Sequence, residues 1–455
     1  MQNYNSKVKN LRQKYLKFIY KSYSWKILNG NLEISFDFVL RSFMRRRVSP
    51  DVRFKPKIII KNIDKKRLAK IGKRALDNLI FHAGLIEIPS YWKATCSPVI
   101  EIQAGALTQE QINWWKNLFI DGMGQFYYEN KIDWRTKDFL KINCLQKTAY
   151  ACLYRQNMED RYLVPFAGGR DSIVTLEGLK KQKKGSPVGL RPREISLFTV
   201  NAINRIQKTV RVSGIKKQII VKRIIDKKLL DLNRRGFLNG HTPFTGVLSF
   251  ISVLCAVIFD YKNIVFSNEK SAEEGNVKYL GKTINHQWAK SAAFEKMFKD
   301  YAKIYLAKDI NYFGYLRKYG ELEISKMLTR YPQYFPVFSS CNAGMRIRTA
   351  FASPELRRGE ERWCGKCPKC LFVYMALYPF LKEKELLKIF GKDIFENRKL
   401  LPIMRQLIGE SGFKPFECVG TKAESRKAFD LCLKKVKKSG KIPYLLTYEL
   451  KRQIK

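Results

Sequence analysis

The chain has 455 residues, too many for one ordinary hydrophobic core, so we expect two or three domains. Hydrophobic residues make up 45% of it and aromatic residues 13%, which excludes extensive disorder. The formal net charge of +47 would attract nucleic acid, an anionic membrane or phosphorylated small molecules, but the basic residues are spread along the chain and do not choose among these partners.

The sequence has no pattern of a membrane span or a secretory signal. The longest apolar run, residues 247–259, is shorter than the roughly 20 residues that cross a bilayer, and it predicts a buried helix. The amino terminus carries charge but has no apolar run followed by a cleavage site. We therefore expect a cytoplasmic protein, in which clustered cysteines bind metal and do not form disulfides.

Residues 1–155 predict an amino-terminal α+β domain. Polar and apolar residues alternate on both sides of Asn29-Gly30-Asn31, which predicts a β-hairpin. A helical apolar pattern covers 66–83 and ends at Gly84, and an apolar segment at 99–103 predicts a further strand.

From residue 156 the pattern changes to strands that are followed by turns and helices, as in a parallel α/β sheet. Apolar segments predict strands at 163–166, 195–201 and 264–268. We assign this second domain to 156–340. The remainder, 341–455, predicts a cysteine-rich metal-binding segment followed by a lysine-rich helical region.

One loop carries the sharpest nucleotide signal, Pro165-Phe166-Ala167-Gly168-Gly169-Arg170-Asp171-Ser172. A glycine pair between a strand and a helix lets backbone amides surround an anion such as pyrophosphate, and the helix dipole favours it. The loop resembles the SGGxDS motif of the PP-loop ATP pyrophosphatases, whose fold is adenine nucleotide alpha hydrolase-like, with Ala167 where serine is usual. The resemblance implies that ATP binds at Ala167, Gly168, Gly169, Arg170, Asp171 and Ser172. An ordinary capped turn is the alternative.

Four cysteines form a second signal. Cys364, Cys367 and Cys370 follow one another at two-residue spacing, and Cys341 precedes them. Such thiolates converge on one ion, and four of them complete a closed tetrahedral zinc site with a structural role. An iron–sulfur cluster uses similar spacing and stays open as an alternative.

Polar residues gather in three loop-like segments, 239–244, 267–274 and 285–287. The first contains His241 and the third contains His286. Asn268, Glu269 and Glu273 lie at or just after the end of a predicted strand, where open α/β sheets bind ligands, so they predict a magnesium or substrate site. Taken singly, each of these residues favours the alternative, a polar loop whose acidic residues cap a helix.

Together these segments resemble the UDP-N-acetylmuramoyl-L-alanyl-L-glutamate epimerases of bacterial cell-wall synthesis. The matching segments are 90–98, 165–172, 239–244, 267–273, 285–287 and 363–370. The resemblance implies an amino-terminal substrate region joined to an ATP-pyrophosphatase region. It also implies the reaction: the terminal L-glutamate of a UDP-linked muramoyl dipeptide becomes D-glutamate, with ATP consumed in the presence of magnesium.

The chemistry of such a reaction narrows the choice of catalytic residues. Adenylation neutralises the carboxylate and makes the α-proton more acidic; a base then removes this proton, and reprotonation on the other face inverts the centre. Lys93, Cys96, His241 and His286 are the candidates, because these residue types can be tuned to titrate near neutral pH. The sequence does not rank them.

Two other interpretations stay open. The chain could be a PP-loop enzyme that modifies transfer RNA or a nucleobase, like the 7-cyano-7-deazaguanine synthases, with nucleic acid as the partner of the positive charge. It could also be a non-catalytic nucleotide-binding protein. We favour the epimerase, because no RNA-binding module is evident and a positive cleft would also hold the diphosphate of a UDP-linked substrate. No pattern indicates an oligomeric state.

Overall fold

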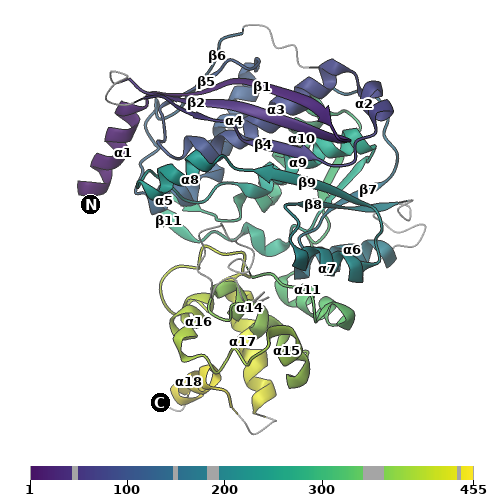
Figure 1. Ribbon diagram of the computed structural model, residues 1–455. Coiled ribbons are helices and arrows are strands. Elements are labelled where there is room, and N and C mark those ends of the chain that lie inside the picture. The colour runs from purple at the N-terminus through teal and green to yellow at the C-terminus, as the bar shows by residue number, and fades with distance from the viewer. Residues whose placement is uncertain are drawn as a thin grey trace.

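The computed structural model describes residues 2–43, 50–146, 152–181, 194–341, 363–437 and 442–453. Within these ranges, eleven strands form one mixed sheet in the order β13-β10-β7-β8-β9-β4-β2-β1-β5-β6, with β3 paired to β2 (Figure 1). The strands of this sheet are β1 (Lys17–Leu28), β2 (Asn31–Arg41), β3 (Val52–Phe54), β4 (Lys57–Ile60), β5 (Val99–Ile102), β6 (Lys141–Cys144), β7 (Tyr162–Pro165), β8 (Ile195–Val200), β9 (Gln218–Ile224), β10 (Asn263–Phe266) and β13 (Asn311–Gly314). A separate hairpin consists of β11 (Val277–Tyr279) and β12 (Lys282–Ile284).

Helices cover the sheet and build the carboxyl-terminal part. The α-helices are α1 (Gln2–Lys14), α2 (Lys65–Ile71), α3 (Lys73–Trp92), α4 (Gln109–Gly122), α5 (Gly124–Glu129), α6 (Arg170–Lys181), α7 (Asn204–Ser213), α8 (Lys227–Arg234), α9 (Phe244–Phe259), α10 (Ala292–Tyr301), α11 (Glu321–Leu328), α14 (Pro368–Leu377), α15 (Glu383–Phe390), α16 (Leu401–Leu407), α17 (Lys422–Val436) and α18 (Tyr444–Gln453). Short helical turns are η1 (Lys270–Glu273), η2 (Trp288–Lys290), η3 (Ala302–Leu306), η4 (Pro332–Tyr334) and η5 (Arg398–Leu400).

The predicted amino-terminal hairpin is confirmed. β1 and β2 pair antiparallel on either side of the turn at Asn29 and Gly30. Both residues have positive φ, 48° and 71°, and such a two-residue turn matches the twist of the strands it joins.

The amino-terminal region and the α/β region share this one sheet. β4 pairs antiparallel with β9, so that Ile60 lies opposite Val221. On the other side of β9 all pairs are parallel: β9 with β8, β8 with β7, β7 with β10, and β10 with β13. The strand–turn–helix pattern predicted this parallel arrangement. The domain boundaries at 155/156 and 340/341 stay predictions.

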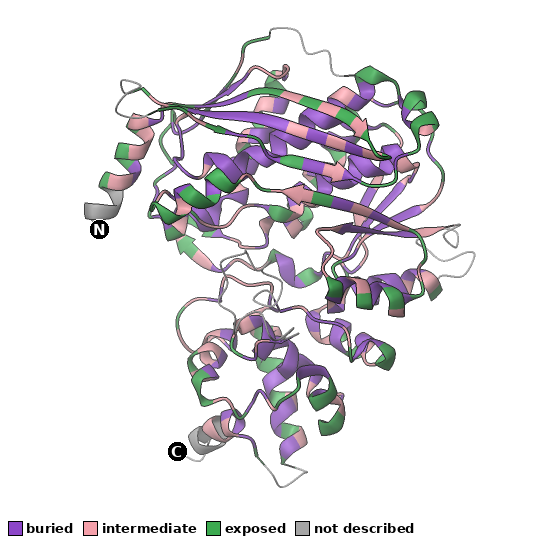
Figure 2. Ribbon diagram, viewed as in Figure 1, coloured by how far each residue is buried: buried purple, intermediate pink, exposed green. Residues whose placement is uncertain are grey.

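The central parallel strands β7, β8 and β10 are buried on both faces, because helices cover each side. Leu163 of β7 and Ile264 of β10 belong to the core that contains α9, whereas the next residues, Val164 and Val265, belong to the core that contains α6. Successive side chains of a strand point to opposite faces, so this alternation places α9 and α6 on opposite sides of β7. Figure 2 shows the central strands and α9 as mostly buried.

The prediction that Gly84 ends a helix is wrong. The chain breaks instead at Gly72, where φ is +81°, and α3 then continues through Gly84 to Trp92. Gly84 stays helical because its missing side chain makes room for Tyr20 of β1, whose hydroxyl would overlap a Cβ at this position. The segment 90–98, which matches the resembled family, is therefore helical at its start.

The helices α14–α18 gather below the sheet, next to α11 (Figure 1). They confirm the predicted helical region, with the lysine-rich α17 at its centre. The apolar run predicted to be a buried helix is α9, and most of its residues are buried. Among the described residues, no helix is both long and apolar enough to span a membrane.

Candidate functional site

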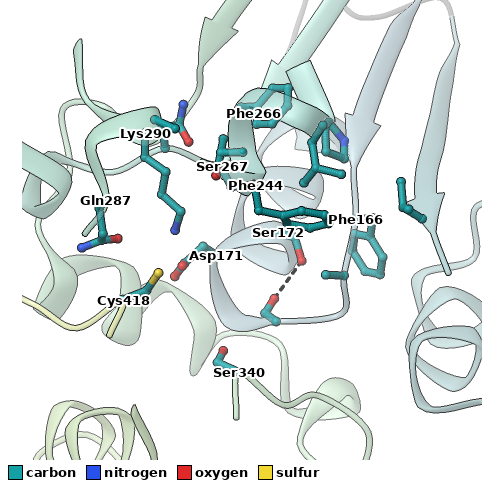
Figure 3. A pocket seen from close by; sticks show the side chains of 18 of the residues that line it. Phe166, Asp171, Ser172, Phe244, Phe266, Ser267, Gln287, Lys290, Ser340 and Cys418 are labelled. Atoms are coloured by element: carbon teal, nitrogen blue, oxygen red, sulfur yellow. Dashed lines mark hydrogen bonds between the residues drawn. The ribbon is translucent and has the colours of Figure 1, made fainter. Parts of the chain in front are cut away.

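A cavity of about 420 Å³ opens at the carboxyl ends of the parallel strands. Its walls include the residues that follow β7 and β10 and the end of β8. β7 pairs with β8 on one side and with β10 on the other, so the chain crosses in opposite directions from β7. Open α/β sheets bind their ligands at such a switch point. Figure 3 shows polar side chains on one side of this cavity and the rings of Phe166, Phe244 and Phe266 on the other.

The predicted glycine loop forms the floor of the cavity between β7 and α6. Gly168 has φ +71°, a conformation that favours glycine. A Cβ on Gly169 would lie 3.2 Å from Ser340 Oγ, so the backbone here fits only a glycine without adjustment. Ser172 Oγ donates to Gly169 O at 2.9 Å and closes the first turn of the helix (Figure 3). The loop is thus a backbone cradle at a helix amino terminus, suited to an anion.

The side chain of Arg170 points away from the cavity, although the residue belongs to the predicted nucleotide loop. It is fully buried, pairs with Glu321, and donates through Nε to Asp171 Oδ1 at 2.8 Å. Burial by itself would raise the pKa of Asp171, but Arg170 and two nearby lysines lower it below the usual value. Asp171 therefore presents a fixed carboxylate to the cavity.

Two lysines on the cavity wall were missed by the sequence analysis. Lys290 ends η2, and its amino group points toward Asp171 in Figure 3. Burial opposes its charge, but Cys418, Glu269 and Asp171 raise its pKa, so it stays an ammonium. Lys369 lies between two of the predicted metal ligands and donates to the carbonyl of Cys418. In the sequence, only their positions indicated a role in the site: Lys290 lies four residues after His286, and Lys369 lies within the cysteine motif.

Gln287 also lines the cavity and was not predicted. Its side chain is buried, and neither Oε1 nor Nε2 has a hydrogen-bond partner among the described residues. The hydroxyl of Ser267, on the same cavity wall, is likewise buried and unpaired within the described ranges. Leaving a buried polar group unpaired costs about 1–3 kcal/mol, so these groups are suited to bind a polar ligand.

Three of the four predicted proton-transfer residues come together. His241 and His286 line the cavity, with ring centroids 4.4 Å apart. Burial lowers the pKa of His286 to about 4. Burial, followed by the charges of His286 and Lys93, lowers the pKa of His241 well below its usual value. Both imidazoles are therefore neutral at pH 7 and able to accept a proton.

Lys93 lies behind the histidine pair and does not line the cavity. Its Nζ donates to Gly240 O at 2.7 Å, next to His241. Burial, and then the charge of Arg223, lower the pKa of Lys93 to about 8. Cys96 lies elsewhere: it is fully buried in the amino-terminal core, 3.5 Å from Arg12, and burial raises its thiol pKa to about 12.

The three residues predicted to bind magnesium or substrate do not all lie at the cavity. Asn268 lines the cavity, and Glu269 is buried beside it with Oε2 unpaired among the described residues. Burial raises the pKa of Glu269, against the opposing charge of Lys290. Glu273 lies outside the cavity, where it accepts from Ala292 N at 2.7 Å and pairs with Arg317 at 3.0 Å.

The four predicted metal-binding cysteines converge, as expected. The Sγ atoms of Cys341, Cys364, Cys367 and Cys370 all lie within 4.8 Å of one another, and three of the pairs are 3.5, 3.6 and 4.0 Å apart. Zinc–sulfur bonds of about 2.3 Å place the sulfurs of a tetrahedral site about 3.8 Å apart, so the donor set fits such a metal.

This cysteine cluster is connected directly to the glycine loop. Ser339 donates its N–H to Gly168 O at 3.2 Å, and Ser340 Oγ accepts from Arg170 N at 3.2 Å. The next residue along the chain is Cys341. A metal bound by the four cysteines would therefore hold the segment that supports the glycine loop.

We expect Cys367→Ser to lower the metal content well below one ion per chain, lower the melting temperature, and weaken binding of a non-hydrolysable ATP analogue. Elemental analysis, thermal unfolding and calorimetric titration measure these three effects. Cys144→Ser, a half-buried cysteine outside the cluster, is the matched control. Full metal occupancy in Cys367→Ser would refute its assignment as a ligand.

Fold and site together define an α/β protein with a ligand cavity at the carboxyl ends of parallel strands and a tetracysteine cluster beside it. The MurL N-terminal domain model matches residues 9–315, and the MurL C-terminal domain model matches residues 337–448. The chain belongs to the MurL family, which confirms the resemblance seen in the sequence.

Three relatives carry the same name, UDP-N-acetyl-alpha-D-muramoyl-L-alanyl-L-glutamate epimerase. The protein of Xanthomonas oryzae pv. oryzae is 32% identical over 356 residues, which are 78% of this chain and 74% of that protein. The protein of Salinispora tropica is 38% identical over 271 residues, 60% of this chain and 55% of its own length. The protein of a Micromonospora species is 37% identical over 275 residues, 60% and 57% respectively. The matched part thus spans little more than half the length of the last two relatives.

Proposed function

We propose that the chain is an ATP-dependent epimerase that converts the terminal L-glutamate of UDP-N-acetylmuramoyl-L-alanyl-L-glutamate to D-glutamate in peptidoglycan precursor synthesis. The observation that carries the proposal is the single cavity that combines a glycine cradle with a pair of neutral histidines. Activation of a carboxylate needs a site that holds the phosphates of ATP, and removal of the α-proton next to that carboxylate needs a base. The glycine loop and the histidines must therefore lie close to each other.

ATP is a substrate in this proposal, and the residues of the cavity fit it. The backbone of Gly168 and Gly169, with the amino end of α6, would hold the phosphates. Lys290 and Lys369 supply positive charge close to this cradle. The apolar wall, formed by Phe166, Phe198, Val200, Phe244, Leu248 and Phe266, would receive the adenine. We therefore assign the fold to the PP-loop ATP pyrophosphatases.

Magnesium and zinc have different places in the proposal. Magnesium prefers oxygen ligands and would accompany the phosphates, with Asn268 and Glu269 as the protein groups nearest to this end of β10. Glu273 is engaged by Arg317 and by the start of α10, so we do not retain it for this role. The tetracysteine cluster would hold zinc, which supplies structure and takes no part in the reaction.

Joining the glutamyl carboxylate to the adenylyl group would give an acyl-adenylate and release pyrophosphate. The activated carboxyl is no longer anionic, so loss of the α-proton creates less negative charge. His241 and His286 are the groups of the cavity suited to accept that proton, because burial keeps them neutral. Hydrolysis to AMP would then return the epimerised dipeptide.

Incubation with the UDP-muramoyl dipeptide, ATP and magnesium tests the proposal. We expect pyrophosphate release that depends on the dipeptide, and D-glutamate after acid hydrolysis and chiral separation of the product. The matched control substrate is the same nucleotide ending in L-alanine, which has no glutamyl carboxylate to activate. Pyrophosphate release with transfer RNA and none with the dipeptide would favour an RNA-modifying enzyme and contradict the proposal.

A further inference from the structure

The two histidines of the cavity lie too close together to act on opposite faces of one carbon. Their ring centroids are 4.4 Å apart, at an interplanar angle of 49°. Rings at this separation are in direct contact, so no α-carbon fits between them. If the proposed epimerisation takes place here, a proton that leaves one face needs a donor for the other face on a different part of the wall.

Beyond the two histidines, the ionisable side chains of the described residues that line the cavity are Asp171, Lys290, Lys369 and Cys418, and Lys369 already donates to a backbone carbonyl. Asp171 is held as a carboxylate, since Arg170 and two lysines lower its pKa against the effect of burial. Lys290 is held as an ammonium by the groups around it. Serine and threonine hydroxyls are much weaker acids than thiols. The thiol that remains on the wall is that of Cys418.

Hydrogen bonds hold the backbone at and near Cys418 on the wall of the cavity. Lys369 donates to its backbone carbonyl, and Asn276 Nδ2 donates to Pro415 O at 2.7 Å, three residues earlier. Figure 3 draws its sulfur on the same side of the cavity as the carboxylate of Asp171, and both residues line the cavity. The α-carbon of the substrate is bonded directly to the carboxyl that becomes adenylated at this loop. Cys418 lines the same cavity as this loop, and therefore the same space in which the α-carbon would lie.

A second observation indicates a ligand on this side. Gln287 has 4% of its surface exposed, lines the same cavity, and has no partner for either polar atom among the described residues. Figure 3 shows Gln287 and Cys418 on the same side of the cavity. A buried amide without partners is suited to the polar end of an acidic substrate.

We propose that Cys418 is the second acid–base residue of the epimerisation: the His241–His286 pair takes the α-proton from one face, and the Cys418 thiol donates a proton to the opposite face. The C–H bond breaks with its electron pair moving into the activated carboxyl. A new C–H bond forms as the S–H bond breaks. Solvent then protonates the thiolate and deprotonates the imidazolium, so the cycle needs no oxidant, reductant or further reactant.

Cys418→Ala tests this role, with Cys418→Ser as a variant of nearly unchanged size. We expect both to release pyrophosphate within about threefold of the unaltered protein and to form D-glutamate about 100-fold more slowly or less. In heavy water the L-glutamyl dipeptide recovered from these variants should carry deuterium at the α-carbon, because the histidines still exchange the proton. Cys152→Ala, a half-buried cysteine outside the cavity, should behave like the unaltered protein.

Formation of D-glutamate at the unaltered rate in Cys418→Ala would overturn the assignment. So would an equal loss of pyrophosphate release and D-glutamate in a variant whose melting temperature is unchanged, since the residue would then serve adenylation. Failure of the proposed function is a different result: the unaltered protein itself would release no pyrophosphate with the dipeptide.

Discussion

Gly169→Val should reduce dipeptide-dependent pyrophosphate release by about 100-fold or more, because a displaced cradle misplaces the reacting phosphate. A Cβ at this position would lie 3.2 Å from Ser340 Oγ and 3.7 Å from Ser339 O. The two methyl groups that valine adds to this Cβ would force the loop away from Ser339 and Ser340. Pyrophosphate assay gives the rate. Far-ultraviolet circular dichroism checks that the fold is retained.

A double substitution provides the control. Gly169→Ala adds only the Cβ, whose nearest neighbour is Ser340 Oγ. Ser340→Ala removes that oxygen, so the pair of substitutions should recover part of the activity that Gly169→Ala loses, despite the lost acceptor for Arg170 N. A Gly169→Val protein that releases pyrophosphate within about threefold of the unaltered rate would remove the loop from the mechanism.

His241→Gln and His286→Gln should retain pyrophosphate release but form D-glutamate about 100- to 10,000-fold more slowly, the usual effect of losing a general base. The third histidine, His82, provides the matched control. It is buried away from the cavity and bonded to Asn78 O and to the hydroxyl of Tyr301. His82→Gln should therefore lower the melting temperature and leave the catalytic rate close to that of the unaltered protein.

The pH dependence follows from the same histidines. A base acts in its neutral form, so its contribution is lost as the pH falls through its pKa. Because burial lowers the pKa of His286 to about 4, epimerisation should persist well below pH 6.5, where an ordinary histidine becomes protonated. Rates of D-glutamate formation between pH 5 and pH 8 measure this. A fall centred near pH 6.5 would contradict the assignment.

Much of the fold and part of the site could be predicted from local sequence patterns. Asn29-Gly30 specifies a hairpin turn, and the cysteine spacing brings the thiols of Cys364, Cys367 and Cys370 together, because in each case neighbouring residues determine the geometry. The glycine loop was found for the same reason. These features depend on few contacts with distant parts of the chain.

The remaining features depend on long-range packing. Gly84 lies inside a helix because Tyr20 of another element occupies the space beside it. The pairing of β4 with β9 joins segments that no local pattern connects. Cys418 reaches the cavity only through the fold, so its type and spacing carried no signal, and Lys290 and Gln287 were marked in the sequence only by their proximity to His286. Glu273 and Cys96, which the sequence offered as candidates, lie outside the cavity for the same reason.

The most direct test of the central claim is incubation of the protein in heavy water with the UDP-muramoyl dipeptide, ATP and magnesium. The account predicts D-glutamate with deuterium at the α-carbon, formed together with AMP and pyrophosphate. Product of the D-configuration that retains its original proton, or that forms without AMP, would contradict it.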